Sequence, residues 1–269
     1  MTETNSSKIV LVTGATGAIG NAIARQLAAK EFQVVLVARD QGKAHRAVNE
    51  ISAVTGNPQV RYELADLSRQ SEIQKLAARW QGPLHVLVNN AAVTPRSRQE
   101  TLEGIELQFA TNVLSYFWMT SAFREILQKS APARIVDVAS YWAGGLDLED
   151  LEFKRRSYSN GAAYRQSKQA NRMLVVAWAE RLRHHGITVN ACHPGDVNSQ
   201  LSNNLGFGGS QSPDQGAETP VWLATNPVVG QVTGKYFEYL VPSRCRFGED
   251  RLAVERLFQI CEEYSKHQL

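Results

Sequence analysis

Residues 8–20 read KIVLVTGATGAIG, an apolar run that passes directly into a glycine-rich turn. The run lacks a polar face, as expected for a strand covered on both sides, and the residues that follow have helical spacing. Glycines let a backbone turn tightly and approach a ligand, while a helix N-terminus offers unpaired N–H groups and a positive dipole end. Any tight strand-to-helix turn favours glycine. Here strand, turn and helix occur together near the N-terminus, which favours a dinucleotide pyrophosphate.

The same alternation of short strands and longer helices continues along almost the whole chain. Helical spacing is seen, for example, in Ala22, Ile23, Gln26, Leu27 and Lys30. Alternating units of this kind predict an α/β fold, a doubly wound Rossmann-type parallel sheet of about seven strands with helices on both faces. The expected strands are residues 8–13, 33–38, 61–66, 84–89, 133–138, 187–192 and 234–240.

Local signals mark several helix boundaries. Ser68 and Ser71 are candidate helix starts, and Gly186 is a candidate helix stop. A long helical stretch is expected over residues 100–128. It contains Asn112, and because asparagine has no intrinsic advantage inside a helix, either solvent exposure or a specific role must explain it.

Composition is typical of one folded domain. Hydrophobic residues make up 43% of the 269, enough for a sizeable core. We expect a single domain over residues 8–269, since no repeat or interior linker is visible, and a disordered polar segment over residues 1–7. The net charge of +3 comes from interspersed signs and gives no footprint for nucleic acid or an acidic membrane.

Cysteine usage and hydropathy point to the cytoplasm. Cys192, Cys245 and Cys261 are widely spaced and odd in number, so no disulfide framework or metal-ligand spacing can be built from them. The first residues lack the apolar segment of a signal peptide, and no apolar run is long enough to span a bilayer. We therefore expect a cytoplasmic protein with no membrane anchor and no metal.

Polar residues follow the third and fourth expected strands, at the edge where open α/β sheets bind ligands. Asp66 and Leu67 close the third, and the Asp66 carboxylate could bond an adenine edge or cap the next helix. Residues 89–92 read NNAA and end the fourth. Small residues there leave room for a cofactor, although asparagine also forms ordinary turns.

The strongest chemical signal is YRQSK at residues 164–168. Tyr164 and Lys168 are four positions apart and share a helix face. A free tyrosine titrates near about 10, and a nearby cation is expected to lower that pKa, which would suit proton transfer. A solvated surface pair is the alternative. Ser140 ends the fifth strand, where its hydroxyl could hold a substrate oxygen or cap the next segment.

Together these residues resemble the short-chain dehydrogenase/reductase family over nearly all of residues 8–264. The family has a TG-rich turn, an Asp after the third strand, Asn-Asn-Ala and a Ser/Tyr/Lys/Asn tetrad. The resemblance maps these features onto residues 14–20, Asp66, residues 89–91, Ser140, Tyr164, Lys168 and Asn112.

Two departures refine the resemblance. Ala18 stands where conventional members place a second glycine, so the turn fits the spacing of extended members on a chain of conventional length. Ser140 and Tyr164 are also separated by a wide insert, residues 142–161. The insert, Asn171 and the GKYF at residues 234–237 resemble the retinol dehydrogenase-like branch, which includes WW-domain oxidoreductases.

The resemblance implies hydride transfer between NADP(H) and a carbonyl or alcohol. Tyr164 would act as general acid or base and Ser140 would stabilise the alkoxide. Lys168 would depress the Tyr164 pKa and bond the nicotinamide ribose. Asn112 would hold a water that links the lysine to solvent. The implied cofactor-binding set is Gly14, Thr16, Gly17, Ala18, Ile19, Gly20, Arg39, Asp66, Leu67, Asn90, Ala91, Tyr164, Lys168, Pro194, Gly195, Val197 and Ser199.

Cofactor choice depends on the end of the second strand. An acid there bonds the ribose 2′-hydroxyl of NAD, whereas arginine accommodates the 2′-phosphate of NADP. By family alignment Ala38 takes the acid position and Arg39 follows, with Lys43 and Arg46 nearby. We expect NADP(H), while Asp40 keeps NAD(H) as the alternative.

The substrate is expected to be a small carbonyl or alcohol, and the resemblance implies an apolar or retinoid-like one. Apolar side chains that could wall its pocket or close loops onto the core are Trp142, Leu146, Leu201, Leu205 and Phe207. Lys154, Arg155 and Arg156 form a basic run that could be a solvated face or could steer an anionic substrate.

The sequence leaves the oligomeric state and a non-catalytic alternative function open. A homodimer could form through residues 100–128 and 164–185, where Met173, Val176 and Trp178 would face a partner or the sheet. A non-catalytic dinucleotide sensor on the same fold is the alternative function, because fold alone does not give function.

Overall fold

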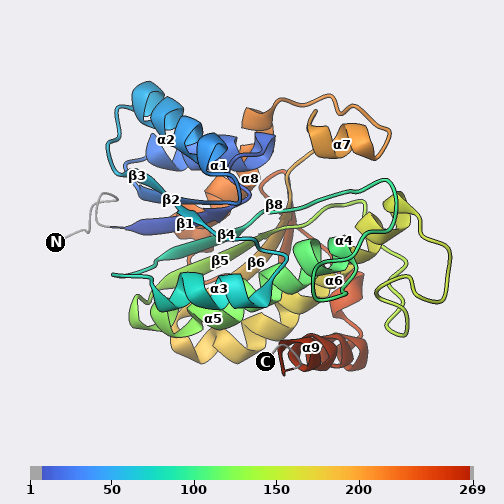
Figure 1. The fold of residues 1–269 in the computed structure, drawn as a ribbon. Coiled ribbons are helices and arrows are strands. Elements are labelled where there is room, and N and C mark those ends of the chain that lie inside the picture. The colour runs from blue at the N-terminus through green and yellow to red at the C-terminus, as the bar shows by residue number, and fades with distance from the viewer. Residues whose placement is uncertain (1–7, 267–269) are drawn as a thin grey trace.

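The computed structural model describes residues 8–266, so the expected disorder of residues 1–7 lies outside the described part. Its centre is one eight-stranded sheet in the order β3-β2-β1-β4-β5-β6-β7-β8 (Figure 1). All neighbouring strands are parallel except β7 and β8. The strands are β1 Ile9–Thr13, β2 Gln33–Ala38, β3 Val60–Leu64, β4 Val86–Asn89, β5 Ala133–Val138, β6 Ile187–His193, β7 Tyr236–Glu238 and β8 Val241–Ser243. The predicted doubly wound fold is confirmed, with one strand more than expected.

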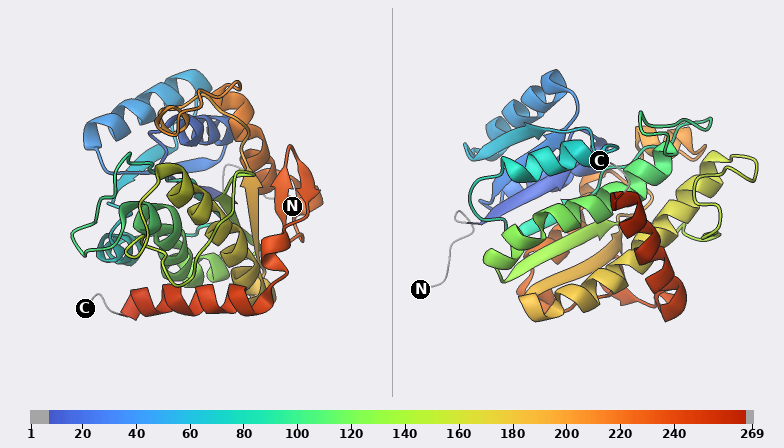
Figure 2. Two further views of the ribbon diagram at one scale, coloured as in Figure 1. Left: turned by 90° about the vertical axis from the view of Figure 1, so that its right-hand side faces the viewer. Right: turned by 60° about the horizontal axis from the view of Figure 1, so that its bottom comes forward.

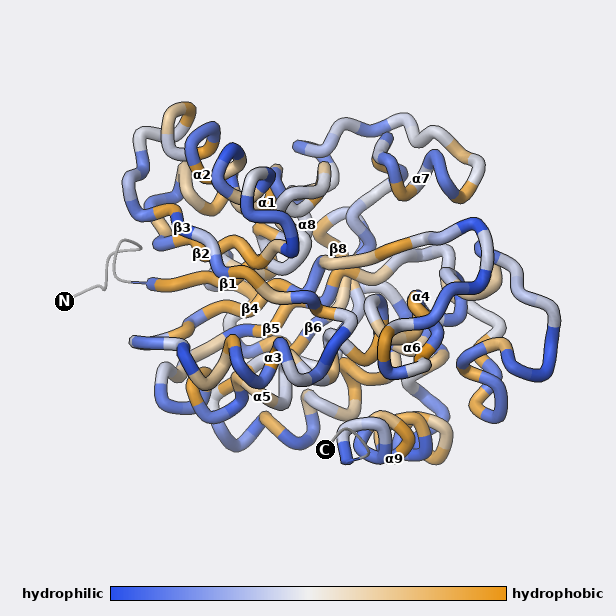
Figure 3. Tube along the Cα trace, in the orientation of Figure 1, coloured by the Kyte–Doolittle hydropathy of each residue, from blue (hydrophilic) through white to orange (hydrophobic). Residues whose placement is uncertain are grey.

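Helices cover both faces of the sheet, with α1, α2 and α8 above it and α3, α5 and α6 below it in Figure 1. The tube in Figure 3 is hydrophobic along the strands between these layers, whereas hydrophilic and hydrophobic residues alternate along the flanking helices. The strands read as apolar because each is buried on both sides. The helices are α1 Ala18–Ala28, α2 Gln41–Thr55, α3 Gln70–Ala78, α4 Leu107–Phe109, α5 Ser115–Lys129, α6 Asn160–Leu182, α7 Gln200–Asn204, α8 Pro213–Thr225 and α9 Arg251–Lys266.

The carboxyl ends of the parallel strands point to one edge, at the right of Figure 1 and facing the viewer in the left panel of Figure 2. There β1 pairs with β2 on one side and with β4 on the other. The chain therefore reverses its direction of winding beside β1, which leaves the crevice where open α/β sheets bind ligands. The glycine turn that follows β1 lies at this point.

The expected helix over residues 100–128 is wrong at its start. Residues 100–106 form a turn closed by a bridge between Glu100 and Glu106, with Gly104 at φ +76°. The helix begins at Leu107, because the Glu106 carboxylate accepts from the N–H groups of Gln108 and Phe109 and caps it. A π-helical turn, Ala110–Leu114, then leads into α5.

The other local expectations are close to the observed elements. Helix α3 begins at Gln70, between the two candidate serines, and Gly186 ends the α6 region in the left-handed conformation. The last expected strand, residues 234–240, shortens to β7 because Tyr239 and Leu240 adopt positive φ and turn the chain into β8. Pro242 in β8 suits an edge strand, where one N–H needs no partner.

The outer face of α6 is covered by the chain itself. Met173, Val176 and Trp178 are all buried, and the Trp178 ring lies 5.0 Å from that of Phe258 on α9. The sequence analysis left open whether these side chains face a partner or the sheet. In the structure they belong to the core of one chain. Within residues 8–266, no helix has the length and apolar character needed to cross a bilayer.

Candidate active site

A cleft of about 540 Å³ opens at the carboxyl edge of the sheet. The turn after β1 forms one end of it, and Tyr164 and Lys168 of α6 also line it. Most of the candidate cofactor residues share this lining, although they come from distant parts of the chain. They are Gly14, Thr16, Gly17, Ala18, Ile19, Gly20, Arg39, Asp66, Leu67, Asn90, Ala91, Tyr164, Lys168, Pro194 and Ser199.

The glycine turn has the form of a phosphate cradle. Gly14 adopts φ +64°, and a Cβ there would lie 2.7 Å from the Ala91 Cα. A Cβ at Gly20 would overlap the Gly14 carbonyl, whereas one at Gly17 would make only ordinary contact. Helix α1 starts without a side-chain cap on its N-terminal N–H groups. Close backbone approach together with an uncapped helix N-terminus fits a pyrophosphate.

Thr13 fastens this turn to the neighbouring strand. Its hydroxyl accepts from the N–H groups of Asn90, at 2.8 Å, and Ala91, at 3.1 Å, and donates to the Val88 carbonyl. The Asn90 amide donates back to the Thr13 carbonyl at 2.9 Å. Asn90 and Ala91 thus fix the floor of the cleft. Sequence reasoning missed Thr13, whose only signal was a hydroxyl directly before the first glycine.

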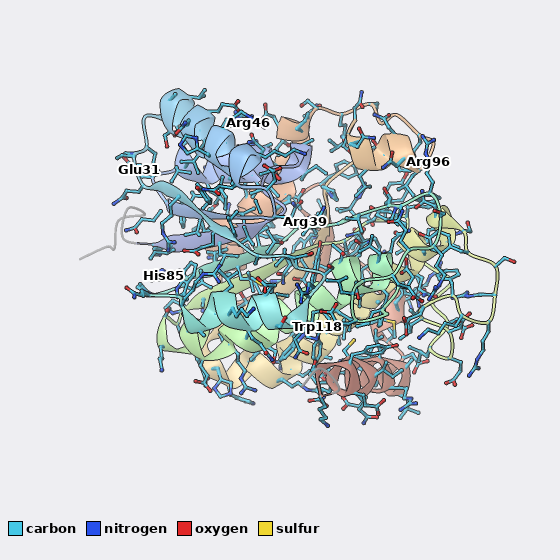
Figure 4. All side chains as sticks on the ribbon, viewed as in Figure 1. Glu31, Arg39, Arg46, His85, Arg96 and Trp118 are labelled. Atoms are coloured by element: carbon cyan, nitrogen blue, oxygen red, sulfur yellow. The ribbon has the colours of Figure 1, made fainter. Side chains whose placement is uncertain are left out.

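The end of β2 carries a positive rim. Ala38 is buried, and Arg39 and Lys43 line the cleft, whereas Asp40 accepts from the Lys43 N–H at 2.7 Å and caps α2. Figure 4 labels Arg39 near the middle of the molecule and Arg46 further out on α2. Asp40, the residue on which the NAD(H) alternative was based, therefore caps helix α2.

Asp66 does not cap helix α3, so that expected function is wrong, and bonding to an adenine edge stays a prediction. Its carboxylate accepts from the N–H and hydroxyl of Ser68, at 3.0 and 2.8 Å, and so shapes the turn before α3. It also lines the cleft, with Leu67 beside it. Arg69, rather than either serine, occupies the N-cap position of α3.

At the inner end of the cleft Tyr164 and Lys168 are buried in α6, so the surface-pair alternative is wrong. The Lys168 ammonium donates to the Val138 carbonyl at 2.8 Å and lies 5.7 Å from the centre of the Tyr164 ring. Ser140 hydrogen-bonds to Tyr164, which lowers the pKa of Tyr164, but burial dominates and raises that pKa to about 12. Tyr164 therefore keeps its proton at neutral pH.

The expected lowering of the Tyr164 pKa by Lys168 is wrong for this structure. Burial lowers the pKa of Lys168 itself to about 8, against the opposing effect of nearby Asp137. Burial likewise raises the pKa of Asp137 to about 7, while its hydrogen bond from Asn89 lowers it. Desolvation thus weakens the cation that was expected to favour the phenolate.

Asn112 is fully buried inside the π-helical turn, so solvent exposure does not explain it. Its side-chain oxygen accepts from the Val93 N–H at 2.8 Å, and its amide donates to the Val93 carbonyl at 3.0 Å. This pair of bonds holds the segment after β4, which lines the cleft. The geometry thus gives the Asn112 side chain a positioning role.

The segment after β6 closes the cleft from the other side. Pro194 and Ser199 line it, and Ser199 caps α7. Gly195, at φ +101°, and Val197, which is buried and bridged to Gln211, lie behind the lining. Gly195 and Val197 therefore contribute to the conformation of the loop after β6 without lining the cleft.

The insert between Ser140 and Tyr164 places an aromatic group close to Tyr164, although Trp142 and Phe207 are not part of the cleft lining. The Trp142 ring lies 6.0 Å from that of Tyr164 and 5.4 Å, edge to face, from that of Phe207. Leu146 instead packs against the core. Leu201 lines the cleft, whereas Leu205 does not.

The basic run of the insert is largely held by internal contacts. Lys154 pairs with Glu152 at 2.8 Å, and Arg156 pairs with Asp150 at 3.4 Å. The Asp150 carboxylate also accepts from three successive backbone N–H groups, those of residues 154–156. Lys154 and Arg156 therefore order the loop, whereas the Arg155 side chain is exposed.

His193, at the end of β6, gives a testable pH dependence. It is buried, its ring nitrogens have no hydrogen-bond partner within residues 8–266, and Tyr141 packs edge to face on it at 4.5 Å. Burial lowers its pKa to about 4, although Asp196 opposes this. Between about 4 and the ordinary value of about 6.5 the unfolded chain binds more protons, so stability must fall on acidification.

We expect His193→Phe, which keeps a ring in this place, to lose part of that acid sensitivity. Urea unfolding at several pH values between 4 and 7 measures it, with His184→Phe on an exposed turn as control. The variant should gain stability relative to the parent as pH falls. Parallel pH profiles for the parent and His193→Phe would contradict the assignment.

The family model described as short chain dehydrogenase matches residues 8–207, which include every candidate residue from Gly14 to Ser199. Retinol dehydrogenase 13 of Mus musculus is 35% identical over 253 residues, covering 87% of this chain and 76% of that protein. Retinol dehydrogenase 12 of Mus musculus is 35% identical over 274 residues, covering 95% and 85%. A crystal structure of a protein from Mycobacterium paratuberculosis has a TM-score of 0.81 at 27% identity, covering 96% of this chain and 93% of that one.

Proposed function

This chain belongs to the short-chain dehydrogenase family, in its retinol dehydrogenase-like branch, and is an oxidoreductase; from that premise we propose that it is an NADP(H)-dependent carbonyl reductase. The observation that carries the proposal is the arrangement of one cleft. A phosphate cradle lies at one end, and a buried Tyr164, hydrogen-bonded to Ser140 and close to Lys168, lies at the other.

The protein supplies the proton of the reaction. Bound NADPH would supply a hydride to the carbonyl carbon. Tyr164 would donate its phenolic proton to the carbonyl oxygen from its place in the cleft lining, where it is hydrogen-bonded to Ser140. The Ser140 hydroxyl would hydrogen-bond the oxygen as it gains negative charge. Tyr164 is thus equipped as the acid of carbonyl reduction, and alcohol oxidation would require its deprotonation.

Lys168 and Asn112 position the reacting groups. Lys168 is anchored by the Val138 carbonyl beside Tyr164 and lines the cleft, where it would bond the nicotinamide ribose. Asn112 holds the segment after β4 through Val93. These contacts would keep the cofactor and Tyr164 in register.

The preference for NADP(H) is supported by the rim of the cleft. Arg39 and Lys43 line it where the adenosine ribose would lie, and the acid position is taken by the small Ala38. The charge of Asp40 is directed to the N-terminus of α2. A 2′-phosphate at this rim would therefore meet the two cations Arg39 and Lys43.

An apolar aldehyde, ketone or retinoid-like compound is the proposed substrate. Trp142 and the half-exposed Phe207 form an aromatic wall beside Tyr164. Two relatives are named retinol dehydrogenases. Oxidation of NADPH with a panel of aldehydes and ketones tests the activity directly.

The wall predicts a dependence on substrate length. We expect Trp142→Ala to raise KM for long apolar aldehydes and to leave KM for short ones almost unchanged, because the partly buried Trp142 ring contributes contact area only to a substrate long enough to reach it. The loss should reach about tenfold for the longest aldehydes, on the order of 1.4 kcal/mol. A chain-length series at saturating NADPH measures this. A uniform loss across the series would mean that Trp142 supports the fold rather than the pocket.

A further inference from the structure

A second cavity, of about 380 Å³, lies next to the catalytic serine but shares no lining residue with the cofactor cleft. It is formed by the loop after β5, the middle of α6 and the segment between β8 and α9. Three of its six lining residues are arginines. The lining consists of Tyr141, Ala143, Arg172, Arg244, Arg246 and Phe247.

Arg172 is the unusual member of this set. It is 7% exposed, and across residues 8–266 its guanidinium makes no hydrogen bond or ion pair, with Nε fully buried and unpartnered. Its flat face lies 3.6 Å from the centre of the Tyr236 ring and 5.0 Å from that of Phe247. Buried cations normally have an anionic partner, because an unpaired buried charge is costly. The aromatic stacking fixes the plane of the guanidinium but leaves its N–H groups without acceptors.

Arg246 adds a second cation without an ion pair in the described part of the chain. It is exposed, and its guanidinium lies 5.7 Å from the same Phe247 ring that Arg172 contacts. Both charges therefore flank one aromatic group. An anion bound in the cavity would therefore meet two guanidinium groups that have no ion pair among residues 8–266.

The remaining charges define what the cavity can bind. Arg244 already forms two bonds with Glu249, at 2.7 and 2.8 Å, so it contributes shape more than free charge. Asp196 approaches the Tyr141 hydroxyl at 3.5 Å from outside the lining, and Glu238 lies near Tyr141 and Tyr236. The cavity itself contains no acidic residue.

We propose that this cavity binds the oxyanion group, phosphate or carboxylate, of a small molecule. Guanidinium groups match both anions in geometry and charge. The volume falls within the range of small-ligand pockets. Tyr141 directly follows Ser140, so the bound anion lies beside the active centre. The site goes beyond the proposed reductase activity and does not depend on it.

Titration of the intact protein with inorganic phosphate and, separately, with succinate tests the proposal. The titrations are followed by calorimetry at constant ionic strength set with chloride. We expect saturable binding of at least one of them. Arg246→Gln removes one positive charge from an exposed side chain and leaves the core undisturbed. It should weaken that binding about tenfold or more, as expected for loss of a charge-assisted bond. Arg183→Gln, an exposed arginine elsewhere, should leave it unchanged.

A further variant separates this cavity from the phosphate cradle of the cofactor cleft. Arg39→Gln acts on the cofactor cleft, so it should leave succinate binding, and the phosphate binding that Arg246→Gln weakens, as in the parent. If the Arg172→Gln variant folds, it should no longer bind phosphate or succinate in this cavity. If it does not fold, the test of the proposal rests on Arg246→Gln. No saturable binding by the parent would overturn the proposal, as would binding that survives Arg246→Gln or that is lost in Arg39→Gln instead.

Discussion

Replacing Tyr164 by phenylalanine is expected to remove most turnover, about a hundredfold to ten-thousandfold, while NADPH binding survives. The substitution keeps the buried ring and its contact with Trp142 and deletes only the hydroxyl that hydrogen-bonds to Ser140. Because that hydroxyl is the proposed proton donor, the loss should appear in kcat. Rates of NADPH oxidation under substrate saturation, with cofactor binding followed by fluorescence, measure both effects.

Tyr116→Phe is the matched control. Tyr116 is equally buried, its ring lies 5.4 Å from the Lys168 ammonium, and its hydroxyl donates to the Val138 carbonyl at 3.3 Å, yet it does not line the cleft. Removing this hydroxyl should leave kcat within a few-fold of the parent. Near-normal turnover in Tyr164→Phe, or equal losses in both variants, would show that Tyr164 is not the acid.

Arg39→Ala is expected to cost NADPH about ten- to hundredfold in kcat/KM and to change NADH little. A charge-assisted contact with a phosphate contributes roughly 1.5–3 kcal/mol, and only NADPH carries a phosphate at the ribose 2′ position. Arg39 lines the cleft at the end of β2 and has an exposed side chain, so its removal should not disturb folding. The comparison requires kcat/KM for both cofactors in parent and variant.

Arg46→Ala serves as control, because Arg46 is also a cation on this side of the molecule but lies outside the cleft lining (Figure 4). It should preserve the preference for NADPH. Equal kcat/KM for NADPH and NADH in the parent would overturn the cofactor assignment. So would a loss in Arg39→Ala that affects both cofactors alike.

The sequence predicted those parts of the fold that depend on local pattern. The run before Gly14 and those at residues 33–38, 133–138 and 187–192 became strands at nearly the expected bounds, because buried parallel strands are continuous apolar runs. The edge hairpin was not predictable in the same way. Its existence depends on positive φ at Tyr239 and Leu240, neither of which is a typical turn residue.

The site was predictable in its members but not in its energetics. The family motifs predicted that Ser140, Tyr164 and Lys168 act together. They do lie close together in the structure, because the end of β5 and helix α6 meet at the same edge of the sheet. The spacing of Tyr164 and Lys168 predicted a lowered tyrosine pKa, whereas burial by neighbouring elements raises it. Burial depends on tertiary packing, so four-residue spacing could not reveal it. The same holds for Arg172, whose position in α6 reads as an ordinary helix residue until Phe247 packs on it.

The central claim, that this cleft performs carbonyl reduction, is tested most directly by one measurement on the parent protein. NADPH binding and NADPH oxidation are followed together over a panel of aldehydes and ketones that includes long apolar members. We expect tight binding and substrate-dependent oxidation, strongest for the apolar carbonyls. Binding of NADPH with no oxidation on any member of the panel would contradict it, and would indicate a dinucleotide-binding protein that performs no chemistry.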